Sequence, residues 1–322
     1  MSGGDMECRR MGESGLTVSV LGYGANNLGR AGTMSEDEKG AAAVVNAALE
    51  AGITYFDSAN VYGKRTGLSE KLLGKALGAR REEVVIATKF GMRLKEDSPV
   101  SARGSRGYML SCLEDSLRRL DTDYIDLYYY HSPDPRTPLE ETVDALESAV
   151  DQGKIRYYAV SNMAGWQTAA TAQLASRGKL VATQNHYNLI DRRAEQEILP
   201  AARYYGLGVV PYFPLAAGLL TGKYTDAVPE GGRLKAGDPK LEAADMDQLR
   251  RYRDFCEERG FAQADLAIAW LAHQDPVASI IAGATRPEQI ASNAKAVDIE
   301  LDDADLAALD EIFPPAGKVA LF

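Results

Sequence analysis

Residues 53–78, "ITYFDSANVYGKRTGLSEKLLGKALG", contain one complete strand–helix unit. The apolar run that ends at Phe56 is typical of a buried strand, and a helix is expected to begin near Ser69. Asp57 lies where the strand should emerge, and Tyr62 lies in the connection between strand and helix. A carboxylate and a phenol brought together at a strand end are either a chance pairing or half of an active site.

The same strand–helix pattern repeats along the chain. Two short strands about a Glu-Ser-Gly turn come first, within residues 8–24, and eight strand–helix units follow. Most strand segments are apolar on both faces, as buried parallel strands are. A doubly wound sheet with a second domain is the alternative, but the alternation is unbroken at mid-chain. The sequence therefore predicts an α/β fold in one domain over residues 1–322: a single (β/α)8 TIM barrel with an N-terminal β-hairpin and an extra C-terminal helix at residues 302–313.

The element boundaries follow from apolar periodicity and capping residues. Ser35 is expected to cap the first helix, with Glu38 at capping-box spacing and Gly52 at its end. The segment after residue 215 is read as a longer loop. Expected strands are residues 20–24, 53–57, 83–90, 124–131, 155–162, 180–188, 207–215 and 278–284; expected helices are residues 35–52, 69–78, 106–121, 138–153, 164–178, 192–206, 261–274 and 286–297.

Composition excludes several classes of function. A formal net charge of -10 argues against a nucleic-acid partner, because no basic face meets the phosphates. No apolar run of about 18 residues occurs, so no membrane span is expected. Three histidines in no metal-ligand spacing leave no expected metal site. Three cysteines without a CxxC pair favour a reducing, cytoplasmic location. The oligomeric state stays open.

Polar residues stand at the ends of three successive predicted strands. Asp57 ends the second strand, Lys89 the third and His131 the fourth, with Tyr62 in the second loop. In a (β/α)8 barrel these strand ends form the face that carries active sites. Each residue alone has an ordinary explanation as a helix cap, a solvent-exposed lysine or a hydrogen-bonded histidine. All four together predict a site.

The four side chains support the reduction of a carbonyl group by hydride. A phenol has a reference pKa of about 10, and an ammonium beside it is expected to lower that pKa. Asp57 would hold Lys89 through a charge-assisted pair. His131 would donate a hydrogen bond to the substrate oxygen and orient it. Tyr62 would then protonate the developing alkoxide as the general acid.

The chain resembles the aldo-keto reductases of the bacterial, general-reductase type over nearly its whole length. The resemblance implies a (β/α)8 barrel and a catalytic tetrad of Asp57, Tyr62, Lys89 and His131. The motifs that carry it are "GITYFDSANVYG", "VVIATKF", "DYIDLYYYHSPDP", "GKIRYYAVSN", "PYFPLAAGLLTGKY" and "GATRPEQIASN".

The resemblance also implies a nicotinamide cofactor, NADP(H), with NAD(H) as the open alternative. A Rossmann turn is not expected, since the glycines of "LGYGANNLG" do not have GxGxxG spacing. A short-chain dehydrogenase is excluded too, because no Tyr-x-x-x-Lys pair occurs. In the aldo-keto reductase arrangement, Arg286 would bind the 2′-phosphate and Tyr212 would stack on the nicotinamide ring. The other expected contacts are Ser161, Asn162 and Gln184 to the carboxamide; Leu215, Gly218 and Lys223 along the pyrophosphate; Gln289 and Asn293 at the adenine; and Gly24, Asp57, Gly283 and Thr285 beside the cofactor.

Two departures from the family pattern bear on specificity. Gly283 stands where some branches have lysine, so Arg286 would carry most of the 2′-phosphate recognition. Ser132 stands where others have an aromatic residue, which predicts a more open or polar pocket. The remaining specificity is expected in the loops of residues 91–105 and 225–245.

The leading hypothesis is an NADP-dependent reductase of an aldehyde or ketone, possibly a sugar. An alternative is a redox-sensing regulatory subunit, since some members of this fold bind NADPH and modulate a partner. A structural protein that reuses the barrel is a third class. The complete tetrad favours the enzyme.

Overall fold

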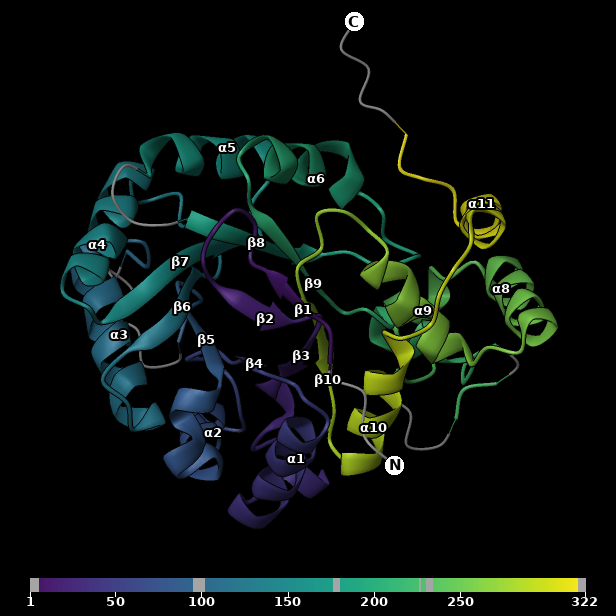
Figure 1. Cartoon of the computed structure of the whole chain (residues 1–322), viewed down its shortest axis with the longest axis horizontal. Helices are drawn as coiled ribbons and strands as arrows, with labels where there is room; N and C mark the ends of the chain where they lie inside the picture. The colour runs from purple at the N-terminus through teal and green to yellow at the C-terminus, as the bar shows by residue number, and fades with distance from the viewer. Residues whose placement is uncertain (1–5, 95–101, 176–179, 226, 230–233, 318–322) are drawn as a thin grey trace, which may run out of the picture.

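Eight parallel strands close into a barrel in the order β10-β3-β4-β5-β6-β7-β8-β9, with helices around it (Figure 1). The computed structural model describes residues 6–94, 102–175, 180–225, 227–229 and 234–317. The predicted barrel, its antiparallel hairpin and the extra C-terminal helix are confirmed. The barrel strands are β3 (Leu21–Gly24), β4 (Tyr55–Asp57), β5 (Val85–Phe90), β6 (Ile125–Tyr130), β7 (Ile155–Ser161), β8 (Leu180–His186), β9 (Gly208–Tyr212) and β10 (Ile280–Gly283).

The helices follow the strands in chain order and lie outside the ring. They are α1 (Glu38–Glu50), α2 (Leu68–Leu77), α3 (Arg106–Leu120), α4 (Leu139–Asp151), α5 (Gly165–Leu174), α6 (Ala194–Tyr204), α7 (Pro239–Glu242), α8 (Met246–Arg259), α9 (Gln263–Ala272), α10 (Pro287–Ala296) and α11 (Asp303–Ile312). The last part of the helix predicted at residues 164–178 lies outside the described residues.

The hairpin of β1 (Cys8–Arg10) and β2 (Thr17–Ser19) lies across the end of the barrel at which the strands begin (Figure 1). Met11, Leu16 and Val18 from this hairpin pack into the apolar cluster inside the barrel. Cys8 is exposed on β1, whereas the other two cysteines are buried. The hairpin therefore closes the barrel floor and leaves the opposite end for the site.

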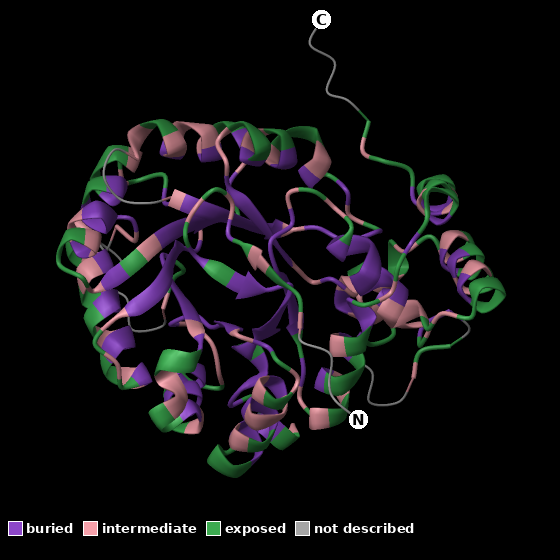
Figure 2. Cartoon of the chain, viewed as in Figure 1, coloured by how far each residue is buried: buried purple, intermediate pink, exposed green. Residues whose placement is uncertain are grey.

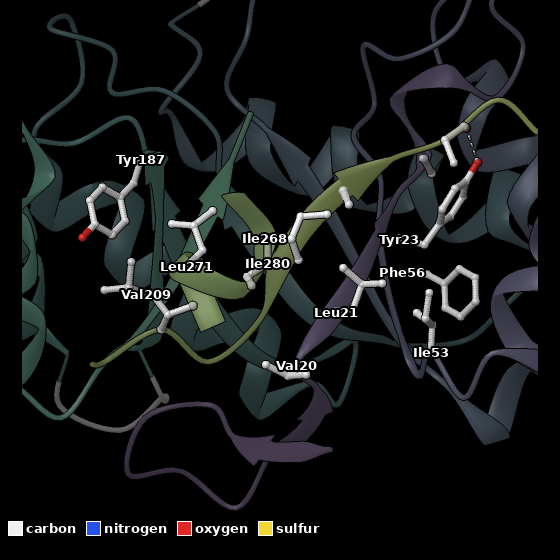
Figure 3. Close-up of a cluster of buried hydrophobic side chains, with 14 of the residues drawn as sticks. Val20, Leu21, Tyr23, Ile53, Phe56, Tyr187, Val209, Ile268, Leu271 and Ile280 are labelled. Carbon is white, nitrogen blue, oxygen red and sulfur yellow. Dashed lines mark hydrogen bonds between the residues drawn. The ribbon is translucent and has the colours of Figure 1, made fainter. Parts of the chain in front are cut away.

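Strand side chains divide between the barrel interior and a larger outer core. The strands are buried almost throughout, and exposure concentrates on the outward faces of the helices (Figure 2). In the outer core, Ile268 and Leu271 of α9 belong to the same cluster as Val209 and Ile280 on neighbouring strands (Figure 3). Full burial of each such side chain stabilises the fold by about 1.5–3 kcal/mol. This core fixes the strand ends that carry the site.

Two details of the sequence prediction are wrong. The cap of α1 is Asp37, whose carboxylate accepts from the Gly40 amide, while the Ser35 hydroxyl donates to the Asn27 carbonyl. The helices α7 and α8 lie in a stretch read as loop. The signals of α8 were present: Asp245 caps its start, Gly260 ends it with a positive φ, and apolar residues recur at helical spacing.

Among the described residues, no helix has both the length and the apolar composition needed to cross a membrane. Within the same part of the chain, no three histidine, cysteine or acidic side chains are grouped so as to hold a metal ion.

Candidate active site

The site begins with the alternation of side chains along β4 and β5. Tyr55 and Ala87 belong to the cluster inside the barrel, so Asp57 and Lys89, two residues further on, also face inward at the upper end of their strands. The sheet register pairs Asp57 with Ala87, and Lys89 with Tyr129 of β6. Both charged side chains therefore reach the same space above the apolar interior.

Lys89 and Asp57 form a buried ion pair. The Lys89 Nζ lies 2.5 Å from Asp57 Oδ1 and 2.6 Å from the carbonyl oxygen of Ser58. The amide Nε2 of Gln184 donates to the second carboxylate oxygen at 2.9 Å. Burial lowers the pKa of Lys89, and the Asp57 charge opposes that shift. Each charge is thus held in place by the other and by further hydrogen bonds, which a buried pair requires.

Tyr62 and His131 lie beside this pair. The Lys89 Nζ is 5.3 Å from the centre of the Tyr62 ring, and the rings of Tyr62 and His131 meet edge to face with centroids 5.8 Å apart. Burial and the Lys89 charge place the pKa of His131 well below its ordinary value, so its imidazole is neutral near pH 7. Its Nδ1 is buried and has no hydrogen-bond partner among the described residues.

The expected lowering of the Tyr62 pKa is not what the structure gives. Burial raises the pKa of Tyr62, and the Asp57 and Tyr212 side chains raise it further. The physical reason is burial of the phenol first, and then the negative charge of Asp57, the direct partner of Lys89. The phenol is consequently protonated at neutral pH, which is the form that an acid needs.

A buried glutamate supports the segment that carries Tyr62. Glu70 on α2 accepts from the Thr88 hydroxyl at 2.5 Å and from Arg119 Nε at 2.6 Å, and its side chain has no exposed surface. The amide of Ser69, the residue before Glu70 on α2, donates to the carbonyl of Tyr62 in the preceding loop. Sequence reasoning missed Glu70. The available signal was helical spacing: Glu70 lies three residues before Leu73 and seven before Leu77, so it shares the buried face of α2 with these leucines.

The predicted carboxamide residues are brought together at the ends of β7, β8 and β9. Asn162 follows Ser161 with a φ of 56°, a conformation unusual outside glycine. Its Nδ2 donates to the His131 carbonyl at 2.8 Å, and its Oδ1 accepts from the Tyr212 hydroxyl at 2.7 Å. A continuous polar connection therefore runs from His131 to Tyr212.

The predicted pyrophosphate segment follows β9 in an unusual backbone conformation. Phe213, Ala216 and Ala217 all have positive φ, as does Gly218 at 106°. Residues other than glycine at positive φ cost of order 1–3 kcal/mol each and persist where the surrounding structure enforces them, often at functional sites. Leu215 lies within this segment and is half-buried, and Lys223 beyond it is exposed.

The predicted adenine-side residues lie where β10 leads into α10. Arg286 is exposed at the start of the helix, and no hydrogen bond or ion pair within the described residues engages its guanidinium. Gln289 is occupied locally, since its Oε1 accepts from the amide and hydroxyl of Thr285. Asn293 is buried.

Two glycines among the predicted contacts have packing explanations. A Cβ on Gly24 would lie 2.8 Å from Ile281 Cγ2, so close packing between β3 and β10 already requires glycine there. A Cβ on Gly283 would lie 3.0 Å from Asn27 Nδ2, which is tight but adjustable. Neither observation places these glycines against a cofactor.

A closed (β/α)8 barrel with a buried lysine–carboxylate pair, a phenol and a neutral imidazole at its open end is the arrangement of a barrel oxidoreductase. The chain belongs to the aldo/keto reductase family, whose sequence model matches residues 20–313. It is therefore an oxidoreductase of carbonyl groups, in a family that generally uses nicotinamide cofactors.

Relatives with different assigned roles cover the chain almost completely. An uncharacterized oxidoreductase of Bacillus subtilis is 40% identical, with 97% of each chain covered. The L-glyceraldehyde 3-phosphate reductase of Escherichia coli is 34% identical over 96% of this chain and 92% of its own. A probable voltage-gated potassium channel subunit beta of Oryza sativa is 38% identical over 91% of this chain and 92% of its own.

Proposed function

We propose that the protein is an NADPH-dependent reductase that converts an aldehyde or ketone to the alcohol, with Tyr62 as general acid. The observation that carries the proposal is the buried Lys89–Asp57 pair beside Tyr62 and His131 at the open end of the barrel. A bound nicotinamide supplies the hydride. The side chains of this protein orient the carbonyl and deliver the proton.

The residues around the site fit a nicotinamide dinucleotide. Within the part of the chain that the structure describes, the Nδ1 of His131 and the guanidinium of Arg286 have no partner, so both polar groups are ready for a ligand. In this proposal Ser161, Asn162 and Gln184 hold the carboxamide. Tyr212 stacks on the nicotinamide ring, and the segment from Leu215 through Gly218 to Lys223 follows the pyrophosphate. The other residues proposed to lie beside the cofactor are Gly24, Gly283, Thr285, Gln289 and Asn293.

The proton step follows from the protonation states of the four side chains. Tyr62 is protonated at neutral pH because its pKa is raised. His131 is neutral and can donate to the carbonyl oxygen from one ring nitrogen, which polarises it. As the alkoxide develops, Tyr62 transfers its proton, and the Lys89 ammonium stabilises the phenolate that remains. General-acid assistance of this kind contributes on the order of 10²–10⁴ in rate.

Preference for NADPH over NADH rests on Arg286. A guanidinium forms two parallel bonds to a phosphate, and the amino end of α10 adds its positive pole. With glycine at 283, no side chain from that position shares the 2′-phosphate.

A short, hydroxylated aldehyde is the substrate class we favour. Ser132 keeps the pocket polar after His131, and the Escherichia coli relative is named for a phosphorylated hydroxyaldehyde. We also propose a cytoplasmic location, which the three free thiols support.

The test is NADPH oxidation by the purified protein across aldehydes, ketones, keto-sugars, phosphorylated trioses and quinones, with Tyr62→Phe as the matched control. We expect turnover that the control lacks. Turnover of equal rate in both proteins would refute the assignment of the acid.

A second function is supported by the likeness to the channel beta subunit of Oryza sativa. In that case the protein would bind NADPH and modulate a partner, and turnover in the screen would be absent despite tight cofactor binding. The complete set of four side chains favours the enzyme.

A further inference from the structure

An imidazole lies flat behind the ring of Tyr212. His186 ends β8 and Tyr212 ends β9, and the sheet register pairs the two residues directly. Their rings are nearly parallel, with an interplanar angle of 7° and centroids 5.5 Å apart, and Phe213 meets the imidazole edge-on. The Tyr212 hydroxyl is fixed at the other end by Asn162. The ring of Tyr212 is thus held from behind and at its tip.

The hydrogen bonds of Asn188 determine which nitrogen of His186 carries a proton. The Asn188 Oδ1 accepts from the amides of Ile190 and Asp191, at 3.0 and 2.9 Å, so the amide orientation is set by the backbone. Its Nδ2 therefore faces His186 Nε2 at 3.1 Å as a donor, while it also donates to the Phe213 carbonyl. The Nε2 must accept, and the proton lies on Nδ1.

The second nitrogen of His186 agrees with this assignment. Its Nδ1 lies 2.9 Å from Asp191 Oδ2, so the Nδ1–H donates to that carboxylate. Asp191 is itself paired with Arg193, and Lys240 of α7 lies over the Phe213 ring, from where its charge acts on His186. Burial lowers the pKa of His186, the Asp191 charge opposes this, and the Arg193 and Lys240 charges add to it.

We propose that His186 is a positioning residue, a neutral imidazole fixed in one tautomer that holds Tyr212 flat for stacking on the nicotinamide. The inference rests on the proposed function, because it takes Tyr212 to be the residue that backs the cofactor ring. An imidazole that gained a proton on Nε2 would face the Asn188 donor and lose that bond. A positive charge would then stand behind Tyr212 and oppose the cationic ring of NADP⁺.

The tautomer is tested first, in the protein without cofactor. With three histidines in the chain, NMR of isotopically labelled histidine resolves each ring, and His186→Phe identifies the signals of His186. We expect a neutral ring with the proton on Nδ1 at pH 7. A proton on Nε2, or a charged ring at that pH, would overturn the inference.

Cofactor binding is tested by fluorescence titration of NADP⁺ against the wild type, His186→Ala and His186→Phe. His186→Ala should bind about two- to tenfold more weakly, the loss of one aromatic contact. His186→Phe retains the stack, and Asp191 keeps Arg193 as partner, so its affinity at pH 7 should match the wild type. Below pH 6 the wild type should lose more affinity than His186→Phe, because only the wild type gains a charge behind Tyr212.

The outcomes separate this inference from the function on which it rests. Urea unfolding first shows that all three proteins are folded. Equal NADP⁺ affinity in the three, with the same pH profile, would overturn the role of His186 and leave the proposed function standing. A wild type that binds neither NADP⁺ nor NADPH would overturn both.

Discussion

Replacing Lys89 with methionine should cost both stability and activity, and the two losses can be separated. Methionine has similar length, but it leaves the Asp57 carboxylate buried without its cation. Breaking a buried pair from one side costs about 3–5 kcal/mol. Asp57 keeps one bond, from Gln184 at 2.9 Å, so we expect a loss of about 3 kcal/mol, at the lower end of that range.

The double variant Asp57→Asn/Lys89→Met is the matched control. It removes both charges and keeps an amide oxygen to accept from Gln184, so most of the lost stability should return. Carbonyl reduction should not return, because the ammonium that stabilises the phenolate is still absent. Urea unfolding measures the first quantity, and single-turnover NADPH oxidation measures the second.

Two results would refute this reasoning. The first is a free energy of unfolding for Lys89→Met within about 1 kcal/mol of the wild type, a margin well below the cost of an unpaired buried charge. That result would mean that the pair contributes little to stability. A double variant that regains both stability and turnover would mean that Lys89 serves the fold alone.

Three further predictions use the same site. Tyr62→Phe should reduce turnover by on the order of 10²–10⁴ with NADPH affinity nearly unchanged, and near-wild-type turnover would exclude the phenol as the acid. Arg286→Ala should weaken NADPH binding by roughly ten- to a hundredfold, since a charged hydrogen bond contributes about 1.5–3 kcal/mol. NADH titration is its control, and equal weakening of both cofactors would make Arg286 a structural residue. The depressed pKa of His131 means that below about pH 6.5 the unfolded chain binds a proton that the folded chain does not, so stability should fall on acidification by at most about 1.4 kcal/mol per pH unit. Urea unfolding between pH 6.5 and 5, a range set by the reference pKa, should show that the stability of His131→Gln falls less steeply than that of the wild type. An unchanged slope would contradict the lowered pKa of His131.

The parts of the fold that the sequence predicted are those that depend on local pattern. Apolar strands that alternate with amphipathic helices can be predicted from residues close together in the sequence. Polar residues at the strand ends then mark the open face of a barrel. The same logic predicted that Asp57 and Lys89 lie close together, because Asp57 ends β4 and Lys89 is the last residue but one of β5.

The parts that it missed depend on competition or on long-range contacts. Ser35 has the chemistry of a helix cap, but its hydroxyl is taken by the Asn27 carbonyl, and Asp37 caps α1 instead. The stack of His186 on Tyr212 joins residues from two strands whose side-chain orientations no local pattern specifies. The raised pKa of Tyr62 likewise depends on burial of its ring and on the charge of Asp57 nearby, which become visible only in three dimensions.

The exposed thiol on the hairpin makes this enzyme suited to oriented attachment. Cys8 lies on the barrel floor, and the chain's other two thiols are buried, so a maleimide should react at that one position. A molecule coupled there to an electrode or a bead would present its open end, where the proposed site lies, to the solution. The hairpin would serve as the base of every immobilised molecule, and the face with the proposed site would be free of the linker.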